Sequence, residues 1–143
     1  MARFSFTAPT TMSATDALAY LADMQNAKTW DPSISSVERL DDGDVRLGSS
    51  FRVILSFSGR DLDLTYHVIE LTPGQSVTLR AESPLFISQD VVRISEGSSG
   101  LSVHYEATLT GRGFARVLDP FFHLSINHFG RQAAPHLRAA LLS

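Results

Sequence analysis

The sequence predicts an α+β protein in which one antiparallel sheet packs a single face against a long C-terminal helix. Apolar and polar residues alternate at 3–8 and again from about Ile34 to Thr110, as in half-buried strands. After Gly113 the apolar spacing changes to about 3.6 residues, which is typical of a helix. With 143 residues, 43% hydrophobic and 19% charged, we expect residues 1–143 to form a single domain.

The N-terminal segment predicts one strand followed by short helical structure. Phe4 and Phe6 share one side of the first alternating run. Ser13 or Thr15 can cap a helix whose apolar residues continue to Met24. We expect either one helix or two short helices with a break near residue 23.

Six further strands are expected between Ile34 and Thr110, because turn signals recur at short intervals through this region. They include Asp42-Gly43, Pro73-Gly74 and the segment 97–100, and such spacing is typical of an antiparallel meander. The alternate positions, Thr78 among them, are expected to face water. The apolar parity places the following residues inward: Phe51, Val53, Leu55, Phe57, Leu62, Leu64, Tyr66, Val68, Val77, Leu79, Ala81, Val92, Ile94, Leu101, Val103, Tyr105, Ala107 and Leu109.

The apolar spacing of the C-terminal region predicts a long helix, which is the one predicted element long enough to cover the sheet. Asp119 before Pro120 resembles an N-cap followed by proline at the first helical position. Pro135 lies inside the pattern and predicts a kink near Arg131. Its inward stripe is Leu118, Phe121, Phe122, Ser125, Phe129, Gln132, Ala133, His136 and Ala140.

Charge and composition exclude several function classes. The formal net charge of −3 and the pI near 5.9 disfavour binding to nucleic acid or to anionic membranes. The absence of cysteine excludes disulfides and thiolate chemistry. The first residues lack a long apolar stretch, so we expect a cytoplasmic protein without a membrane span, either a monomer or a homodimer.

Metal and cofactor chemistry also lack sequence support. His123, His128 and His136 are five and eight residues apart, which does not give the i, i+4 pair that a helical metal site uses. Phosphate-binding and dinucleotide-binding glycine motifs are absent. We therefore expect no metal and no cofactor.

Asp90 is the candidate catalytic residue, because its parity matches that of Val92 and places it inward. A carboxylate facing an apolar interior has a raised pKa unless it is paired, and it can act as an acid, a base or a polar anchor. The alternative is that Asp90 lies near a strand end and meets water or caps a backbone amide. Tyr66 and Tyr105 are inward by the same parity, either to orient a ligand or as core residues that need one hydrogen-bond partner.

Two further candidates have both a functional and a structural interpretation. Trp30 lies just after the first helices and can stack on a flat ligand at a cavity mouth, or can anchor helix to sheet. Ser125 is a polar group in an apolar helix stripe, which is the kind of group that fixes ligand orientation in a cavity.

Several segments, in this order and spacing, resemble the START-like superfamily, in particular its polyketide cyclase/dehydrase branch. The resemblance covers nearly the whole chain. It rests on Trp30-x-Pro32, on residues 36–40 before Asp42-Gly43, and on residues 48–53, 64–70, 77–80, 90–94 and 100–107. It implies a helix-grip (START/Bet v 1-like) fold, in which a seven-stranded antiparallel sheet wraps round the C-terminal helix and encloses a cavity for a hydrophobic ligand.

The resemblance implies a function as well as a fold. The leading hypothesis is a binder of a small polyketide-, lipid- or quinone-like molecule, with cyclisation or dehydration as the reaction if it is an enzyme. In that case Asp90 is the acid or base, and Tyr66, Tyr105 and Ser125 orient carbonyls. The alternatives are a non-catalytic lipid or quinone carrier or sensor, and a packed interaction module. The expected ligand-binding residues are Trp30, Phe51, Val53, Leu64, Tyr66, Leu79, Val92, Val103, Tyr105, Phe121, Phe122, Ser125 and Phe129.

Overall fold

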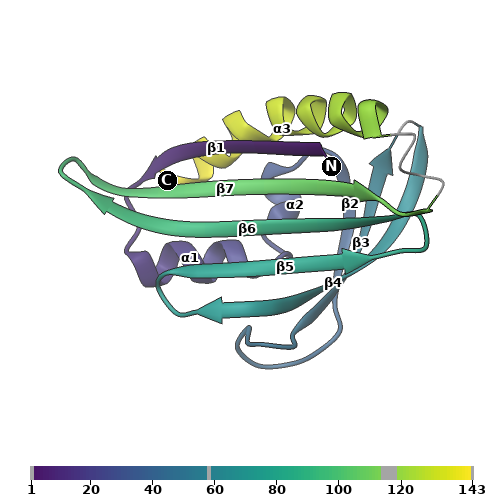
Figure 1. Ribbon diagram of the computed structural model, residues 1–143. Helices are drawn as coiled ribbons and strands as arrows, with labels where there is room; N and C mark the ends of the chain where they lie inside the picture. The colour runs from purple at the N-terminus through teal and green to yellow at the C-terminus, as the bar shows by residue number, and fades with distance from the viewer. Residues whose placement is uncertain (1, 58, 114–118, 143) are drawn as a thin grey trace.

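Seven antiparallel strands form one sheet in the computed structural model, which describes residues 2–57, 59–113 and 119–142, without the side chains of 57, 119, 121–123, 125 and 129. The strand order is β1-β7-β6-β5-β4-β3-β2, so β1 joins the meander by pairing with the last strand. Figure 1 shows β2 and β3 running steeply across the direction of β6 and β7, which gives the sheet its curl. The strands are β1 (Ala2–Thr10), β2 (Ile34–Arg39), β3 (Ser50–Phe57), β4 (Arg60–Thr72), β5 (Ser76–Glu82), β6 (Phe86–Gly97) and β7 (Gly100–Gly111).

The predicted meander of six strands is confirmed in order and in its turns. β4 and β5 are joined through Gly74, and β6 and β7 through Gly100. Both glycines have positive φ, 72° and 119°, which other residues rarely adopt. The glycines that interrupt the alternation are therefore the residues that let each strand return beside its neighbour.

Two short helices, α1 (Ala14–Ala22) and α2 (Ala27–Trp30), follow β1, so the break near Asp23 is confirmed. Ser13 caps α1, since its Oγ accepts a hydrogen bond from the Asp16 amide at 3.1 Å. α1 packs against β5 and β6, and α2 packs against β2 and α3. These helices cover the part of the inner sheet face that the C-terminal helix does not reach (Figure 1).

The long helix α3 (Asp119–Leu141) packs mainly against β1 and β7. Leu137 and Leu141 are fully buried, and the Thr10 hydroxyl donates to the Leu141 carbonyl at 2.8 Å. Pro135 lies inside this helix, and the kink expected near Arg131 stays a prediction. The C-terminal half of α3 is therefore held firmly on the first strand.

Burial follows the predicted parity along the sheet. Of the residues expected to point inward, Phe51, Val53, Val77 and Val103 have no exposed surface. Thr78 is an exception, because it was expected to face water and is only 8% exposed. It pairs with residues of both β4 and β6 in a central strand, where longer neighbouring side chains cover a short threonine.

Candidate functional site

A cavity of about 130 Å³ lies between the inner face of the sheet and helices α2 and α3. A cavity of about 150 Å³ is enough to bind benzene, so this slightly smaller cavity is close to the size of a single ring. Its surface is mostly apolar, with a small group of polar side chains. The described residues that line it are Phe4, Phe6, Met24, Ala27, Trp30, Asp31, Ser33, Ile34, Leu55, Leu62, Leu64, Tyr66, Phe86, Ser88, Asp90, Tyr105, Ala107, Leu109, Ile126, Gly130 and Ala133.

Asp90 and Tyr105 form a hydrogen-bonded pair in this cavity. Asp90 pairs with Ala107 across the β6–β7 ladder, and Tyr105 lies two residues away on β7, so both side chains share the inner face. The Tyr105 hydroxyl donates to Asp90 Oδ2 at 2.8 Å. The strand register therefore places a phenol and a carboxyl together among apolar neighbours.

Aromatic rings fix the position of Tyr105. Its ring stacks on Phe6 with centroids 5.8 Å apart, and Trp30 meets it edge-on at 5.7 Å. Phe6 comes from β1 and Trp30 from α2, so two elements besides its own strand β7 hold the phenol that contacts Asp90. This packing keeps the hydroxyl directed at the carboxyl group.

Burial raises the pKa of Asp90 from its ordinary 3.8 to about 6. The hydrogen bond from Tyr105 opposes this rise, and the nearby carboxylate of Asp31 adds to it. The same apolar surroundings, together with Asp90, raise the pKa of Tyr105 well above 10, so its hydroxyl stays neutral. Asp90 can thus gain or lose a proton near neutral pH while Tyr105 remains a hydrogen-bond donor.

Asp31 is a second carboxyl group at the cavity, and the sequence reasoning did not find it. It follows α2 directly, and its Oδ1 accepts from the Ser33 amide at 3.0 Å and from the Ser33 hydroxyl at 2.7 Å. Burial raises its pKa above 3.8, while the two bonds from Ser33 lower it. The only sequence signal was its place inside the Trp30-x-Pro32 segment, where no alternation indicates direction.

Tyr66 and Ser88 provide the remaining paired hydroxyls of the cavity. Tyr66 Oη lies 2.7 Å from Ser88 Oγ, and burial raises the pKa of Tyr66 well above 10. β4 and β6 are not adjacent strands, so this bond spans the intervening β5. One of the two hydroxyl hydrogens is used between them, which leaves the other for a further acceptor.

The sequence-predicted site residues fall into three groups. Asp90, Trp30, Leu64, Tyr66 and Tyr105 line the cavity. A second group lies buried in the packed core, away from the lining, so its ligand-binding role stays a prediction: Phe51, Val53, Leu79, Val92 and Val103. The third group is on α3, and its side chains lie outside the described part of the structure: Phe121, Phe122, Ser125 and Phe129.

Within residues 2–57, 59–113 and 119–142, no group of three or more His, Asp or Glu side chains is arranged to hold a metal ion. Among the same residues, no helix combines the length and the apolar character needed to cross a membrane.

A curled seven-stranded antiparallel sheet, closed on a C-terminal helix around an apolar cavity, is the START/Bet v 1-like fold. The family model described as "Polyketide cyclase / dehydrase and lipid transport" matches residues 1–140. The chain belongs to this family. Among curated protein sequences, none matches the chain.

Solved structures share the fold at low sequence identity. A START superfamily protein from Mycobacterium smegmatis has a TM-score of 0.73 at 15% identity, over 97% of this chain and 96% of that one. The ginseng major latex-like protein 151 from Panax ginseng has 0.72 at 13%, over 99% and 97%. The di-domain ARO/CYC BexL from the BE-7585A biosynthetic pathway has 0.72 at 13%, over 99% of this chain and 50% of that one. At these identities the likeness shows the fold alone.

Proposed function

We propose that the protein binds a small, ring-bearing hydrophobic molecule in the cavity between sheet and α3, and that Asp90 transfers a proton on that molecule. The observation that carries this proposal is the Asp90 carboxyl group, which faces an apolar cavity and is hydrogen-bonded to Tyr105. An apolar pocket binds a ligand of matching shape, and its few polar groups fix the orientation of that ligand. The open space favours ligand binding over a fully packed interaction module.

The geometry supports a cyclisation of the aldol type. The Asp90 carboxylate removes a proton from a carbon next to a carbonyl group, and the resulting enolate attacks a second carbonyl carbon to form the new carbon–carbon bond. The alkoxide then takes the proton back from Asp90, so atoms and charges balance. The Tyr66–Ser88 pair has one hydroxyl hydrogen not used between them, and this hydrogen stabilises the developing oxyanion by hydrogen bonding.

The pKa of Asp90 fits this role. A general base works best when its pKa lies near the working pH, and a value of about 6 keeps most of the carboxylate ionised at neutral pH while allowing it to hold a proton briefly. The family description includes lipid transport as well as cyclase and dehydrase activity. Lipid transport needs the cavity but no proton transfer. Replacing Asp90 should therefore abolish an enzymatic activity but not a transport activity.

Native mass spectrometry of the purified protein, followed by denaturing analysis of released molecules, tests the proposal. We expect one small apolar molecule per chain, either carried from cells or taken up from a panel of aromatic polyketides, quinones and lipids. Incubation should then give a product of the same mass for cyclisation, separated by chromatography, or a product lighter by one water for dehydration.

Asp90→Asn is the matched variant, and Asp63→Asn on the exposed surface is its control. Asp90→Asn should still take up ligand at saturating concentration but lose turnover, whereas Asp63→Asn should retain both. Ligand released unchanged by the parent protein after long incubation would contradict the proton-transfer role and leave a carrier. A protein that takes up none of the panel would contradict ligand binding itself.

A further inference from the structure

The described lining of the cavity contains acidic side chains and no basic one. Asp31 and Asp90 line it, and no Lys, Arg or His is among the described lining residues. The two carboxyl groups are close enough for Asp31 to disfavour the charged form of Asp90. Buried carboxylates are usually compensated by a cation, because an uncompensated charge in an apolar site costs free energy.

Among the described residues, each of these carboxyl groups has one oxygen that accepts no hydrogen bond. At Asp90 the Tyr105 hydroxyl uses Oδ2, and at Asp31 the Ser33 amide and hydroxyl both use Oδ1. Within the described residues, no donor is recorded for Asp90 Oδ1 or Asp31 Oδ2. A carboxylate oxygen only accepts hydrogen bonds, so a ligand that meets these atoms must be a donor.

Aromatic faces near the carboxyl groups add a second attraction for a cation. Phe6 and Trp30 each contact the ring of Tyr105, which is the residue bonded to Asp90. The electron-rich faces of aromatic rings attract ammonium groups, and this attraction is larger at sites shielded from water. The same rings also pack favourably on an aromatic ligand.

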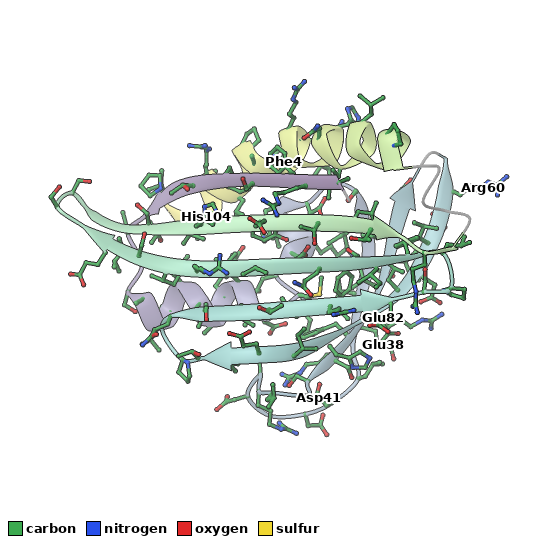
Figure 2. The ribbon with its side chains drawn as sticks, in the orientation of Figure 1. Phe4, Glu38, Asp41, Arg60, Glu82 and His104 are labelled. Carbon is green, nitrogen blue, oxygen red and sulfur yellow. The ribbon has the colours of Figure 1, made fainter. Side chains whose placement is uncertain are left out.

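The wall at α3 restricts the size of the ligand. The Phe4 ring lies directly against the backbone of Gly130, so close that a Cβ atom at position 130 would overlap the ring. Figure 2 shows Phe4 on β1 beneath α3. The cavity volume of about 130 Å³ is close to the size of one ring, and this contact bounds the cavity at the described part of α3.

We propose that the ligand of this cavity is a primary amine on a single aromatic ring, with its ammonium group bound by Asp90 and Asp31 and its ring held among Phe6, Trp30 and Tyr105. This inference rests on the ligand-binding part of the proposed function, because it assigns a chemical class to the molecule that the cavity binds. With this ligand, the Asp90 carboxylate is the counter-ion of the ammonium group and not the base of the aldol-type step. The protonated amine supplies the donors that the free carboxylate oxygens need and the positive charge that the lining lacks.

Benzylamine and benzyl alcohol are the probes, since they share a ring and differ in the charged group. Binding at pH 7.5 is measured by isothermal titration calorimetry with the parent protein, Asp90→Asn, Asp31→Asn and the surface control Asp63→Asn. Benzylamine should bind the parent about tenfold more tightly than benzyl alcohol, as expected for a desolvated charge pair. Asp90→Asn and Asp31→Asn should each weaken benzylamine by about tenfold and leave benzyl alcohol within about threefold.

The outcomes separate this inference from the proposed function. Equal binding of the two probes, or tighter binding of benzyl alcohol, overturns the amine assignment while the cavity remains a hydrophobic ligand site. Benzylamine binding that neither Asp90→Asn nor Asp31→Asn weakens also overturns it. Failure of both probes to bind also overturns the amine assignment, whereas ligand binding in the cavity is tested separately by uptake of the panel of molecules.

Discussion

Asp90→Asn is expected to stabilise the protein at neutral pH. The folded-state pKa of Asp90 is about 6, above its ordinary 3.8, so the folded protein holds this proton more tightly than the unfolded chain does. The parent therefore loses stability as pH rises from about 4 to about 6, and the full loss persists above that range. The difference between the two pKa values corresponds to ~3 kcal/mol. Asparagine carries no charge and keeps an oxygen that can accept the bond from Tyr105.

Urea denaturation of parent and variant across pH 4 to 8 measures this effect. The gain in free energy of unfolding should be near zero at pH 4 and reach up to ~3 kcal/mol at pH 7.5, which corresponds to about 5–10 °C in Tm. Asp63→Asn serves as the control, because Arg52 lowers the pKa of Asp63 and the charged form is favoured there. That variant should lose a little stability at neutral pH. An Asp90→Asn variant that is no more stable than the parent at pH 7.5 would refute the reasoning.

Three further substitutions probe the cavity and its support. Tyr105→Phe removes the hydrogen bond that lowers the pKa of Asp90, so a ¹³C NMR titration should place the Asp90 midpoint above about 6, and an unchanged midpoint would contradict the bond's role. Gly130→Ala gains ~1 kcal/mol of helix propensity but forces the Phe4 ring to move at a cost of ~1–3 kcal/mol, so denaturation should show no net gain and ring-sized probes should bind more weakly. Leu137→Ala leaves a cavity at a fully buried helix position and should lose ~2–5 kcal/mol in the same assay, whereas a loss below ~1 kcal/mol would mean that α3 is not packed as described.

The strands and the long helix can be predicted from the local spacing of apolar residues in the sequence. Alternation placed Phe51, Val53 and Tyr66 on the inner face, and the structure confirms their burial. The change of period after Gly113 indicated the long helix that becomes α3. These features depend on residues close together in the chain, so one sequence is enough to predict them.

The composition of the site depends on contacts between distant elements, and the sequence predicts it only in part. Parity correctly placed Asp90 inward, but its partner Tyr105 is set by the β6–β7 register. Parity also does not separate a cavity wall from packed core, so Val103 was expected to bind ligand and lies in the core instead of the lining. Asp31 lies in a connection without periodicity, and Phe6 belonged to a strand whose position beside β7 was not predicted.

Residues on the exposed surface serve as controls in experiments on the cavity. Arg60 points away from the sheet at the β3–β4 turn (Figure 2), and Arg52 and Asp63 form an ion pair at 2.6 Å with about half of each side chain exposed. A ligand that binds only to such exposed positions would leave the cavity residues unaffected. Residues on the inner and outer faces of neighbouring strands therefore distinguish binding in the cavity from binding at the surface.

Backbone amide NMR during titration with benzyl alcohol tests the central claim most directly, because it locates binding without assuming a charge on the ligand. The account predicts saturable shifts centred on the amides of Ser88, Asp90 and Ala107, which line the cavity from β6 and β7. Shifts confined to exposed positions such as Asp63, or no saturable shifts at all, would contradict the assignment of this cavity as the ligand-binding site.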